Sequence, residues 1–449
     1  MLVKEIIEAT DGTLLSGRLD DDITHFTQDS RACHEGSLYI PIIGANHDGH
    51  DFIASAFEHH ASAIITQKKV NYPDKDVILV KDTLKALGDM ARYVREHSHA
   101  IVVGITGSVG KTSTKDMIFS VVCEKYKALK TLGNYNNNIG LPLTILRYKD
   151  EEAMVIEMGM NHLGEIDYLT NIAKPNVAAI TNVGTAHIGE VGSRDNILKA
   201  KMEITHGLQD GGILIVNHDN DKLATVKPDG FVLKTIGIDD PADLNAKNVA
   251  LSEDGSDFDV AYQGQNYHVH LSVPGKHFVY NALVAMAVGL SIDIPMEKCI
   301  HGVETFELTK NRADKLTLKD DITLFDGTYN ANLDSMKASI DVLANCKGRK
   351  IAVLGDMLEL GQYEEKLHRE VGKYLVDQNI DLTLAVGKAS EYIISEIKKN
   401  GGNGEHFDNN EALTKALLET VKPHDVLLVK ASNGMHLKDV VEQLKERFS

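Results

Sequence analysis

Short apolar runs alternate with longer amphipathic stretches through the middle of the chain. The runs at residues 101–106, 153–159, 176–184 and 212–219 are rich in Val, Ile and Ala, and helical patterns separate them. A short apolar run with β-branched residues is typical of a buried strand, and apolar positions that recur every three or four residues are typical of a helix. Strands that alternate with helices in this way predict a parallel sheet covered by helices.

The same alternation returns in the last third of the chain. Three more strands are predicted at residues 349–357, 382–387 and 426–432. Helical patterns lie between them near residues 334–345, 364–378 and 411–421. This part of the chain is therefore expected to form a second, Rossmann-like unit with helices around a parallel sheet.

The first part of the chain has shorter strand candidates, at residues 37–42, 62–66 and 77–80, and a helix is predicted from Thr83 to about His97. We therefore expect an α/β protein with three domains. The predicted domains are a small α/β N-terminal domain at residues 1–98, a central parallel-sheet domain at 99–312 and a Rossmann-like C-terminal domain at 313–449.

Composition and charge exclude several classes of protein. The chain has 449 residues, of which 65 are acidic and 47 basic, and its formal charge is −18. A nucleic-acid partner would need a basic face. The four cysteines form no CxxC pair, which favours a reducing compartment, and no apolar run approaches the ~18 residues of a membrane span. We expect a cytoplasmic protein with no nucleic-acid partner and no membrane insertion.

Residues 102–114 predict a phosphate-binding loop, which makes the central domain P-loop ATPase-like. A strand leads into a loop with Gly107 and Gly110, and Lys111-Thr112 begin a helical run. Glycines let backbone N–H groups approach anionic oxygens, the lysine reaches the terminal phosphates, and the hydroxyl binds magnesium. The spacing is TGxxGK[ST], shorter than the common GxxxxGK[ST]. The residues expected to hold the phosphates are Gly107, Ser108, Val109, Gly110, Lys111, Thr112 and Ser113.

Three further side chains follow the predicted strands of the central domain. Glu157 ends its strand, and in a parallel sheet that end faces the same crevice as the phosphate loop. His187 follows the next strand in a glycine-rich loop, where it fits either a loop imidazole or a ligand. Lys201 lies in a later helical stretch, and its spacing alone predicts a solvated surface lysine. Because magnesium prefers carboxylate and hydroxyl oxygens, Glu157 is expected to be a magnesium ligand.

Two asparagine-rich segments carry the remaining candidates. Residues 131–144 place asparagines between two glycines, and residues 325–335 place polar side chains just after a strand. Such amides suit hydrogen bonding to a polar substrate or to the γ-phosphate, although a polar loop alone also explains the first segment. Asp334-Ser335 is predicted to cap the following helix. The candidate contacts are Asn134, Asn136, Asn137, Asn138, Asp326, Tyr329, Asn330 and Asn332.

In this order, the motifs resemble the Mur ligases, the ATP-dependent amino-acid ligases of peptidoglycan precursor synthesis, over essentially the whole chain. The resemblance rests on ITGSVGKTS (105–113), GNYNNNIGLPLT (133–144), EMGMNHLGEI (157–166), TNVGTAHIGEVGS (181–193), KAKMEI (199–204) and PGKHFVYNALVAMAV (274–288). The segments 45–53, 328–336 and 353–361 point to the member that adds D-Ala-D-Ala. The member that adds the third amino acid would carry a DNPR-type motif, which is absent.

The resemblance implies roles for the central residues. Lys111 would contact the transferred phosphoryl group, and Thr112, Glu157 and His187 would belong to the metal site. Lys201 matches the family's carbamylated lysine, whose carbamate faces a second magnesium ion. Lys111, His187 and Lys201 are therefore the implied catalytic residues.

The resemblance also implies contacts to the nucleotides. Asn281 would contact adenine, while Arg312 and Asp326 would reach ATP from the third domain. Ser30 and Arg31 fall where the N-terminal domain of the family binds the UDP group.

Several positions depart from the family pattern. Gly327 replaces an aspartate, Leu333 replaces a proline, and Phe278 stands where asparagine is usual. Ala431 and Asn433 stand in a segment that usually reads KGSR, so an arginine is missing. These departures bear on the contacts to ATP and dipeptide, not on the reaction class.

The resemblance implies ATP with two magnesium ions, a UDP-muramyl peptide and D-Ala-D-Ala as substrates, and an acyl phosphate intermediate. Because an acyl phosphate must be kept from water, the third domain is expected to close over the site. We expect the protein to be a monomer. Folylpolyglutamate synthase shares this fold and mechanism but lacks a separate N-terminal UDP domain. A nucleotide-dependent switch protein is a third alternative. A switch GTPase would carry the longer phosphate loop and an NKxD motif, and neither is present.

Overall fold

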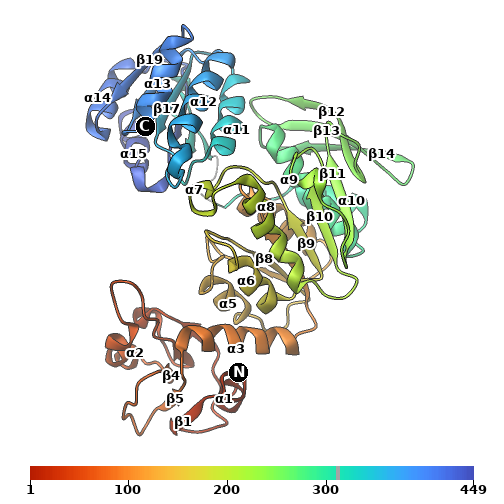
Figure 1. The fold of residues 1–449 in the computed structure, drawn as a ribbon, viewed down its shortest axis with the longest axis vertical. Helices are drawn as coiled ribbons and strands as arrows, with labels where there is room; N and C mark the ends of the chain where they lie inside the picture. Colours follow the sequence, from red (N-terminus) through yellow and green to blue (C-terminus); the bar gives the residue numbers. More distant parts are fainter. Residues whose placement is uncertain (310–313) are drawn as a thin grey trace.

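The computed structural model describes residues 1–309 and 314–449, and it contains three α/β units, each built on its own sheet (Figure 1). The predicted α/β class is confirmed. The sheets lie within residues 13–79, 101–271 and 314–430. The central unit lies between the other two, and the domain limits at 98/99 and 312/313 remain predictions.

The N-terminal unit has a five-stranded sheet in the order β1-β5-β4-β3-β2, in which only β1 is antiparallel to its neighbour. Its strands are β1 (Thr13–Ser16), β2 (His25–Thr27), β3 (Ser37–Tyr39), β4 (Ala63–Thr66) and β5 (Asp76–Leu79), and its longer helices are α1 (Val3–Thr10), α2 (Ile53–Glu58) and α3 (Thr83–His97). The predicted helix is therefore confirmed. Asp82 caps the start of α3, and its side chain accepts a hydrogen bond from the Lys85 backbone amide at 2.9 Å.

Helix α3 joins the N-terminal unit to the central one. The Arg95 guanidinium donates to the carbonyls of Ala173 and Lys174 at 2.8 and 2.9 Å. A Cβ atom at Gly88 would lie 2.2 Å from the Tyr168 hydroxyl, so the helix packs directly on the central unit.

The central sheet has nine strands in the order β14-β13-β12-β11-β10-β9-β6-β8-β7. Its strands are β6 (Ile101–Thr106), β7 (Ala128–Lys130), β8 (Ala153–Glu157), β9 (Val177–Ile180), β10 (Ile213–Asn217), β11 (Val232–Gly237), β12 (Leu244–Leu251), β13 (Ser256–Tyr262) and β14 (Gln265–Leu271). The four predicted strands are β6, β8, β9 and β10, and they are parallel as expected. The prediction missed the antiparallel extension formed by β12, β13 and β14.

Helices cover both faces of the central sheet. One face carries α4 (Lys111–Cys123), α9 (Lys276–Ser291) and α10 (Met296–Glu304), and the other carries α5 (Gly140–Ile145), α6 (Glu165–Ala173) and α8 (Arg194–Met202). Successive residues of a strand point to opposite faces, so Val103 packs against the first group of helices and Val102 packs into the cluster on the other face.

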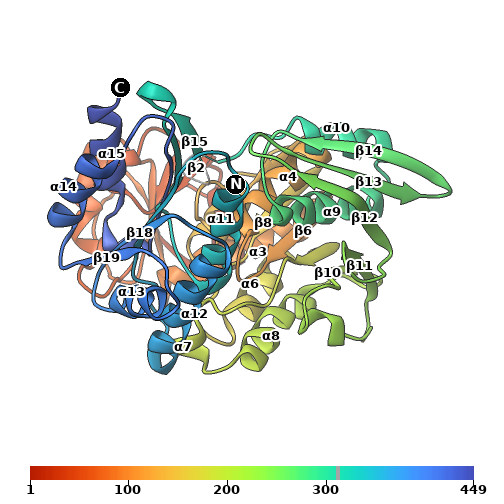
Figure 2. The same ribbon diagram turned by 90° about the horizontal axis from the view of Figure 1, so that it is seen from above.

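The C-terminal sheet has the order β15-β16-β20-β17-β18-β19, with only β15 antiparallel. Its strands are β15 (Asp314–Thr317), β16 (Thr323–Gly327), β17 (Lys350–Gly355), β18 (Leu382–Val386), β19 (Gly404–Phe407) and β20 (Val426–Lys430), and its helices are α11 (Leu333–Ala344), α12 (Glu364–Asp377), α13 (Ser390–Lys399), α14 (Asn410–Thr420) and α15 (Lys438–Arg447). The predicted strands and helices of this unit are confirmed. Seen from above, α11 and α12 lie on the side that faces the central unit (Figure 2).

One predicted helix cap is wrong. Asn332, not Asp334-Ser335, caps α11: its side chain accepts a hydrogen bond from the Ser335 amide at 2.9 Å, and the Ser335 hydroxyl accepts one from the Asn332 amide at 3.0 Å. Asp334 instead turns to the central unit, where it accepts hydrogen bonds from Thr185.

Among the described residues, we find no helix that combines the length and the apolar character needed to cross a bilayer.

Candidate active site

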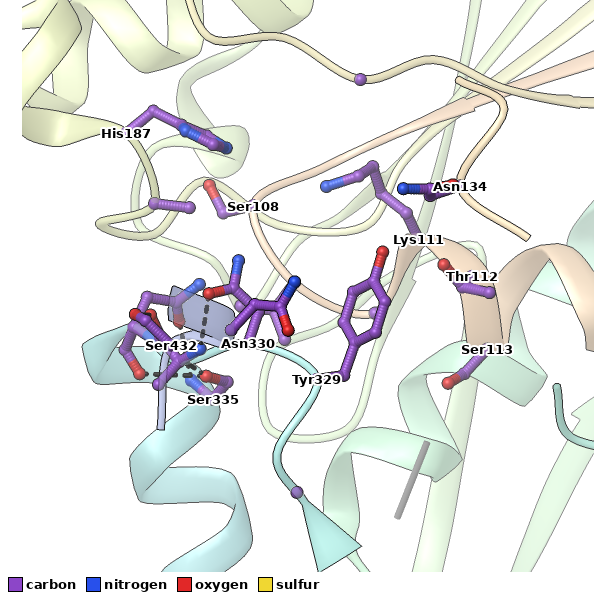
Figure 3. Close-up of a pocket in the computed structure, with 18 of the residues that line it drawn as sticks. Ser108, Lys111, Thr112, Ser113, Asn134, His187, Tyr329, Asn330, Ser335 and Ser432 are labelled. Carbon is purple, nitrogen blue, oxygen red and sulfur yellow. Dashed lines mark hydrogen bonds between the residues drawn. The ribbon is translucent and has the colours of Figure 1, made fainter. Parts of the chain in front are cut away.

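A cavity of about 460 Å³ lies where the central and C-terminal units meet (Figure 3). His187, Ser108 and Lys111 of the central unit face Tyr329 and Asn330 of the C-terminal unit across this space. The predicted site residues that line it are Ser108, Val109, Gly110, Lys111, Thr112, Ser113, Asn134, Asn136, Glu157, His187, Asn281, Tyr329, Asn330 and Asn332. Most of the predicted nucleotide and metal residues are thus brought together.

The phosphate loop is shaped for an anion. Gly110 precedes α4 with φ +81°, and a Cβ atom there would lie 3.2 Å from the Asn281 side chain. No side chain caps the first turn of α4, so its N–H groups and the partial positive charge of the helix start face the cavity. Gly107 (φ +155°) lies so close to Thr181 that any Cβ atom would clash. The loop therefore needs glycine at both positions.

Asn182, to which the sequence analysis assigned no role, binds the phosphate loop. Its side-chain oxygen accepts hydrogen bonds from the amides of Ser108 and Val109 at 3.0 and 2.9 Å. It follows β9 in the TNVG segment, so its position after a strand next to the phosphate strand was the available signal. The Lys111 ammonium donates to the Gly107 carbonyl at 2.9 Å and lines the cavity.

Glu157 lies at the end of β8, as predicted, and its side chain is almost fully buried. One carboxylate oxygen accepts a hydrogen bond from the Thr112 hydroxyl at 3.0 Å, and the other accepts one from the side-chain amide of Asn136 at 2.8 Å. The described part of the chain contains no group of three or more His, Cys, Asp or Glu residues that could hold a metal ion by themselves. Magnesium at a nucleotide needs only one or two protein oxygens beside phosphates and waters, so Thr112 and Glu157 fit such an ion.

Lys115 is a second feature that the sequence reasoning missed. Its side chain is completely buried, with the ammonium 3.9 Å from Glu157 and 3.6 Å from Asp116. Burial lowers the pKa of Lys115, and the two carboxylates oppose that shift. Position 115 is three residues after Thr112 and thus on the same face of α4, which is the signal that could have identified it.

His187 joins the two units. It has φ +61° at the start of the short helix α7 (Ile188–Val191), and its Nδ1 lies 2.9 Å from a carboxylate oxygen of Glu359 in the C-terminal unit. Burial lowers the pKa of His187, the positive charge of Lys111 lowers it further, and Glu359 opposes the shift. The ring also lines the cavity, which fits a ligand better than an ordinary loop imidazole.

Lys201 contradicts the expectation of a solvated surface lysine. Its side chain is 1% exposed, because α8 buries the face that carries Ile197 and Lys201, four residues apart. Burial, followed by the charge of Lys111, lowers the pKa of Lys201 well below its ordinary value. Burial and the charge of Lys111 therefore both favour the neutral amine of Lys201 over its cation.

Several predicted residues do not line this cavity. Asp326 is buried at the end of β16, where it accepts hydrogen bonds from the Thr328 amide and hydroxyl at 3.0 and 2.7 Å. Ser30 and Arg31 lie in the N-terminal unit, and Arg31 pairs with Asp29 at 2.8 Å. Arg312 lies outside the described residues.

A second cavity, of about 610 Å³, adjoins the first. It lies between the start of α3, the asparagine-rich loop and the loop before α6, and it is lined by Asn137 and Asn138. Asn137 also holds the start of α5, since its side chain accepts a hydrogen bond from the Gly140 amide at 2.8 Å. Both cavities share Asn134, Asn136, Gly159, Met160 and Asn161.

The departures from the family pattern lie at or near the first cavity. Gly327 and Asn433 line it, and Leu333 begins α11. Lys430 donates to the Asn330 carbonyl at 2.9 Å, which holds the loop that carries Tyr329.

Three family models match the chain in succession. The model of the Mur ligase family catalytic domain matches residues 22–95, that of the Mur ligase middle domain matches 105–289, and that of the Mur ligase glutamate ligase domain matches 311–433.

Full-length relatives agree with these models. The chain is 36% identical to the UDP-N-acetylmuramoyl-tripeptide–D-alanyl-D-alanine ligase of Bacillus subtilis, with 99% of this chain and 98% of the relative covered. It is 34% identical to the protein of the same name from Escherichia coli, with 96% and 97% covered.

Solved structures are similar over the same length. A crystal structure of MurF from Acinetobacter baumannii has a TM-score of 0.93 and 30% identity, with 99% of this chain and 98% of that chain covered. The MurF ligase of Thermotoga maritima, solved in complex with ADP, has a TM-score of 0.84 and 29% identity, with 94% and 97% covered. The chain therefore belongs to the Mur ligase family.

Proposed function

We propose that this protein is an ATP-dependent ligase that joins D-alanyl-D-alanine to the terminal carboxylate of a UDP-N-acetylmuramoyl-tripeptide. One observation carries the proposal: a single cavity is lined by the phosphate loop and Glu157 of the central unit and by Tyr329 and Asn330 of the C-terminal unit. No side chain caps the start of α4 at this loop. The full-length similarity to ligases of that name supports the substrates, and the relative solved with ADP supports the nucleotide.

Residues 107–113 would hold the phosphates of ATP. Asn281 suits the adenine end, because it lines the cavity with a buried side-chain N–H group that has no hydrogen-bond partner among the described residues. Arg312 and Asp326 stay proposed nucleotide contacts on the family resemblance alone. Since Asp326 is turned to Thr328, it would have to exchange this partner to reach ATP.

Magnesium would neutralise phosphate charge during the transfer, and Thr112, Glu157 and His187 are its proposed ligands. We propose that Lys201 carries a carbamate toward a second ion. The carbamate forms when a neutral amine adds to CO₂ and loses a proton, and burial of Lys201 favours that neutral amine. An unmodified lysine cation would repel the ions, whereas carbamate oxygens are ligands that magnesium prefers.

The reaction follows from what these side chains can do. A carboxylate is a poor acyl donor, so its oxygen attacks the γ-phosphate of ATP, and the products are an acyl phosphate and ADP. Lys111 stabilises the negative charge of the transferring group. The dipeptide amine then attacks the acyl carbon and loses a proton as the amide forms, and phosphate leaves with the oxygen that the carboxylate supplied. Tyr329, Asn330 and Asn332 would cover the intermediate and shield it from water.

The second cavity offers a path for the tripeptide. We propose that the UDP group binds the N-terminal domain at Ser30 and Arg31, and that the peptide passes Asn137 and Asn138 toward Asn136. This path would end at Glu157 and the phosphate loop, because the two cavities share Asn136. We propose that the protein works as a monomer in the cytoplasm, where ATP is made.

Measuring ADP release tests the proposal. We expect release only when ATP, a UDP-muramyl tripeptide and D-Ala-D-Ala are all present. Release with a folate and glutamate would identify a folylpolyglutamate synthase instead. Nucleotide hydrolysis without any acceptor would favour the switch protein.

A further inference from the structure

The loop at residues 182–192 lies between the phosphate loop and the C-terminal unit. On the phosphate side, Asn182 binds the amides of Ser108 and Val109, and the Gly184 amide donates to the Ser108 hydroxyl at 3.0 Å. Any shift of this loop would therefore disturb the phosphate loop directly.

The C-terminal unit binds the other side of the same loop. One carboxylate oxygen of Asp334 accepts hydrogen bonds from the Thr185 amide at 2.8 Å and the Thr185 hydroxyl at 3.0 Å. Glu359 contacts the loop twice: its carboxylate lies 2.9 Å from His187 Nδ1, and its carbonyl accepts a hydrogen bond from the Gly189 amide at 3.1 Å.

Two glycines of the loop are explained only by this contact. A Cβ atom at Gly184 would lie 2.2 Å from the Asp334 carboxylate, and one at Gly189 would lie 2.5 Å from the Glu359 carbonyl. Neither glycine has a positive φ, so alanine would suit the backbone at both positions. Glycine is needed there because the C-terminal unit approaches so closely.

The contact with Glu359 also decides how the His187 ring is presented. A carboxylate can only accept hydrogen bonds, so Nδ1 carries the proton, and in the neutral ring Nε2 keeps its lone pair. The ring lines the nucleotide cavity, where that lone pair is available to a cation (Figure 3). A carboxylate behind a histidine ligand is a common way to fix both its tautomer and its orientation.

We propose that Glu359 and Asp334 are positioning residues of the ligation. They dock the C-terminal unit on residues 182–192, and Glu359 thereby orients His187, so the metal site is complete only when the two units are docked. The inference rests on the proposed function, and it explains the VLGDMLELG segment (353–361), for which the reaction itself supplies no role.

Glu359→Ala and Gly189→Ala test this inference in the full-length protein. We expect each to lower kcat at least ~10-fold, the scale for losing a hydrogen bond to a charged group, and to enlarge the radius of gyration of the Mg·ADP complex in small-angle X-ray scattering. Glu359→Gln should recover part of kcat, because its amide oxygen can still accept from Nδ1.

Matched controls separate docking from folding. Glu365→Ala removes an exposed carboxylate of the C-terminal unit that pairs with Arg369, and Gly44→Ala adds a Cβ atom that meets only ordinary contacts. Both should keep the wild-type kcat and radius. The urea midpoints of Glu359→Ala and Gly189→Ala should match the wild type, because the Glu359 carboxylate and the Gly189 amide each bind a residue of the other unit.

The inference is overturned if Glu359→Ala or Gly189→Ala keeps the wild-type kcat, or if kcat falls while the radius with Mg·ADP stays unchanged. Failure of the proposed function would look different, since the wild type itself would then release no ADP with the two substrates.

Discussion

Lysines distinguish this site at the scale of single residues, and Lys201 among them is buried. Lys111 could be predicted as a site residue because it belongs to the TGxxGK[ST] motif, which is typical of a phosphate-binding loop. Lys201 could not, because spacing shows only which face of a helix a residue occupies, whereas burial depends on what the sheet places opposite that face. The resemblance named Lys201, and the structure supplies the physical reason, which is a desolvated amine near Lys111.

Lys201→Ala should lose ligation and regain part of it with formate or acetate. A small carboxylate can enter the vacated space and return the oxygens that a carbamate would offer to magnesium. Turnover of Lys201→Ala with and without these anions, beside the wild type stripped of CO₂ and then given bicarbonate, measures the effect. Full activity of Lys201→Ala without additives would exclude the carbamate.

The same lysine makes stability depend on pH. Its pKa is lowered in the folded state, so between that value and about 10.4 the unfolded chain binds more protons than the folded one. The free energy of unfolding therefore rises with pH in this window, by up to about 1.4 kcal/mol per pH unit. Urea unfolding of the wild type and Lys201→Met in CO₂-free buffer isolates this contribution, because all other titrating groups are shared. If the free energy of unfolding changed with pH in the same way in both proteins, Lys201 would not be desolvated in the folded state.

At the scale of elements, strand ends and helix starts position the chemistry. The alternation of apolar runs predicted the parallel strands and thus the place of Glu157 after β8. It did not predict β12–β14, because these strands are half exposed and their alternating polar residues resemble a loop. The cap of α11 was also difficult to predict, because Asn332, Asp334 and Ser335 are all residue types that suit a helix start. Only the structure shows that Asn332 caps the helix and that Asp334 binds Thr185 instead.

Asn332→Ala should show whether this residue is more than a cap. Loss of the capping hydrogen bond should lower the free energy of unfolding by ~1 kcal/mol. Asn409→Ala is the matched control, because Asn409 caps α14 in the same way, with a hydrogen bond from the Ala412 amide at 2.9 Å. We expect equal stability losses in both variants and a loss of turnover in Asn332→Ala alone. Wild-type turnover in both variants would leave Asn332 a purely structural residue.

At the scale of the whole molecule, the proposed function divides the substrates between the three units. The sequence pattern predicted the three units, but not the contacts that join them. Asp334, Glu359 and Arg95 are polar residues whose partners lie far away in the chain, and no local spacing indicates such pairs.

Arg31→Ala should weaken binding of the UDP-muramyl tripeptide ~10-fold and leave ATP binding unchanged, because a charge-assisted hydrogen bond to an anionic group is lost. Arg18→Ala is the control: both guanidiniums are exposed and paired with an aspartate of the same unit. Isothermal titration calorimetry of both variants measures the two affinities. An equal effect on UDP-substrate binding in both variants would indicate general electrostatics and not a UDP site.

The central claim is that this site makes an acyl phosphate, and transfer of an oxygen label tests it most directly. The tripeptide is prepared with ¹⁸O in its terminal carboxylate and incubated with the protein, ATP, magnesium and D-Ala-D-Ala, and the released phosphate is analysed by mass spectrometry. If the carboxylate attacks the γ-phosphate, each phosphate released with an amide bond carries one ¹⁸O atom. Phosphate without the label, released while the amide forms, would contradict the account.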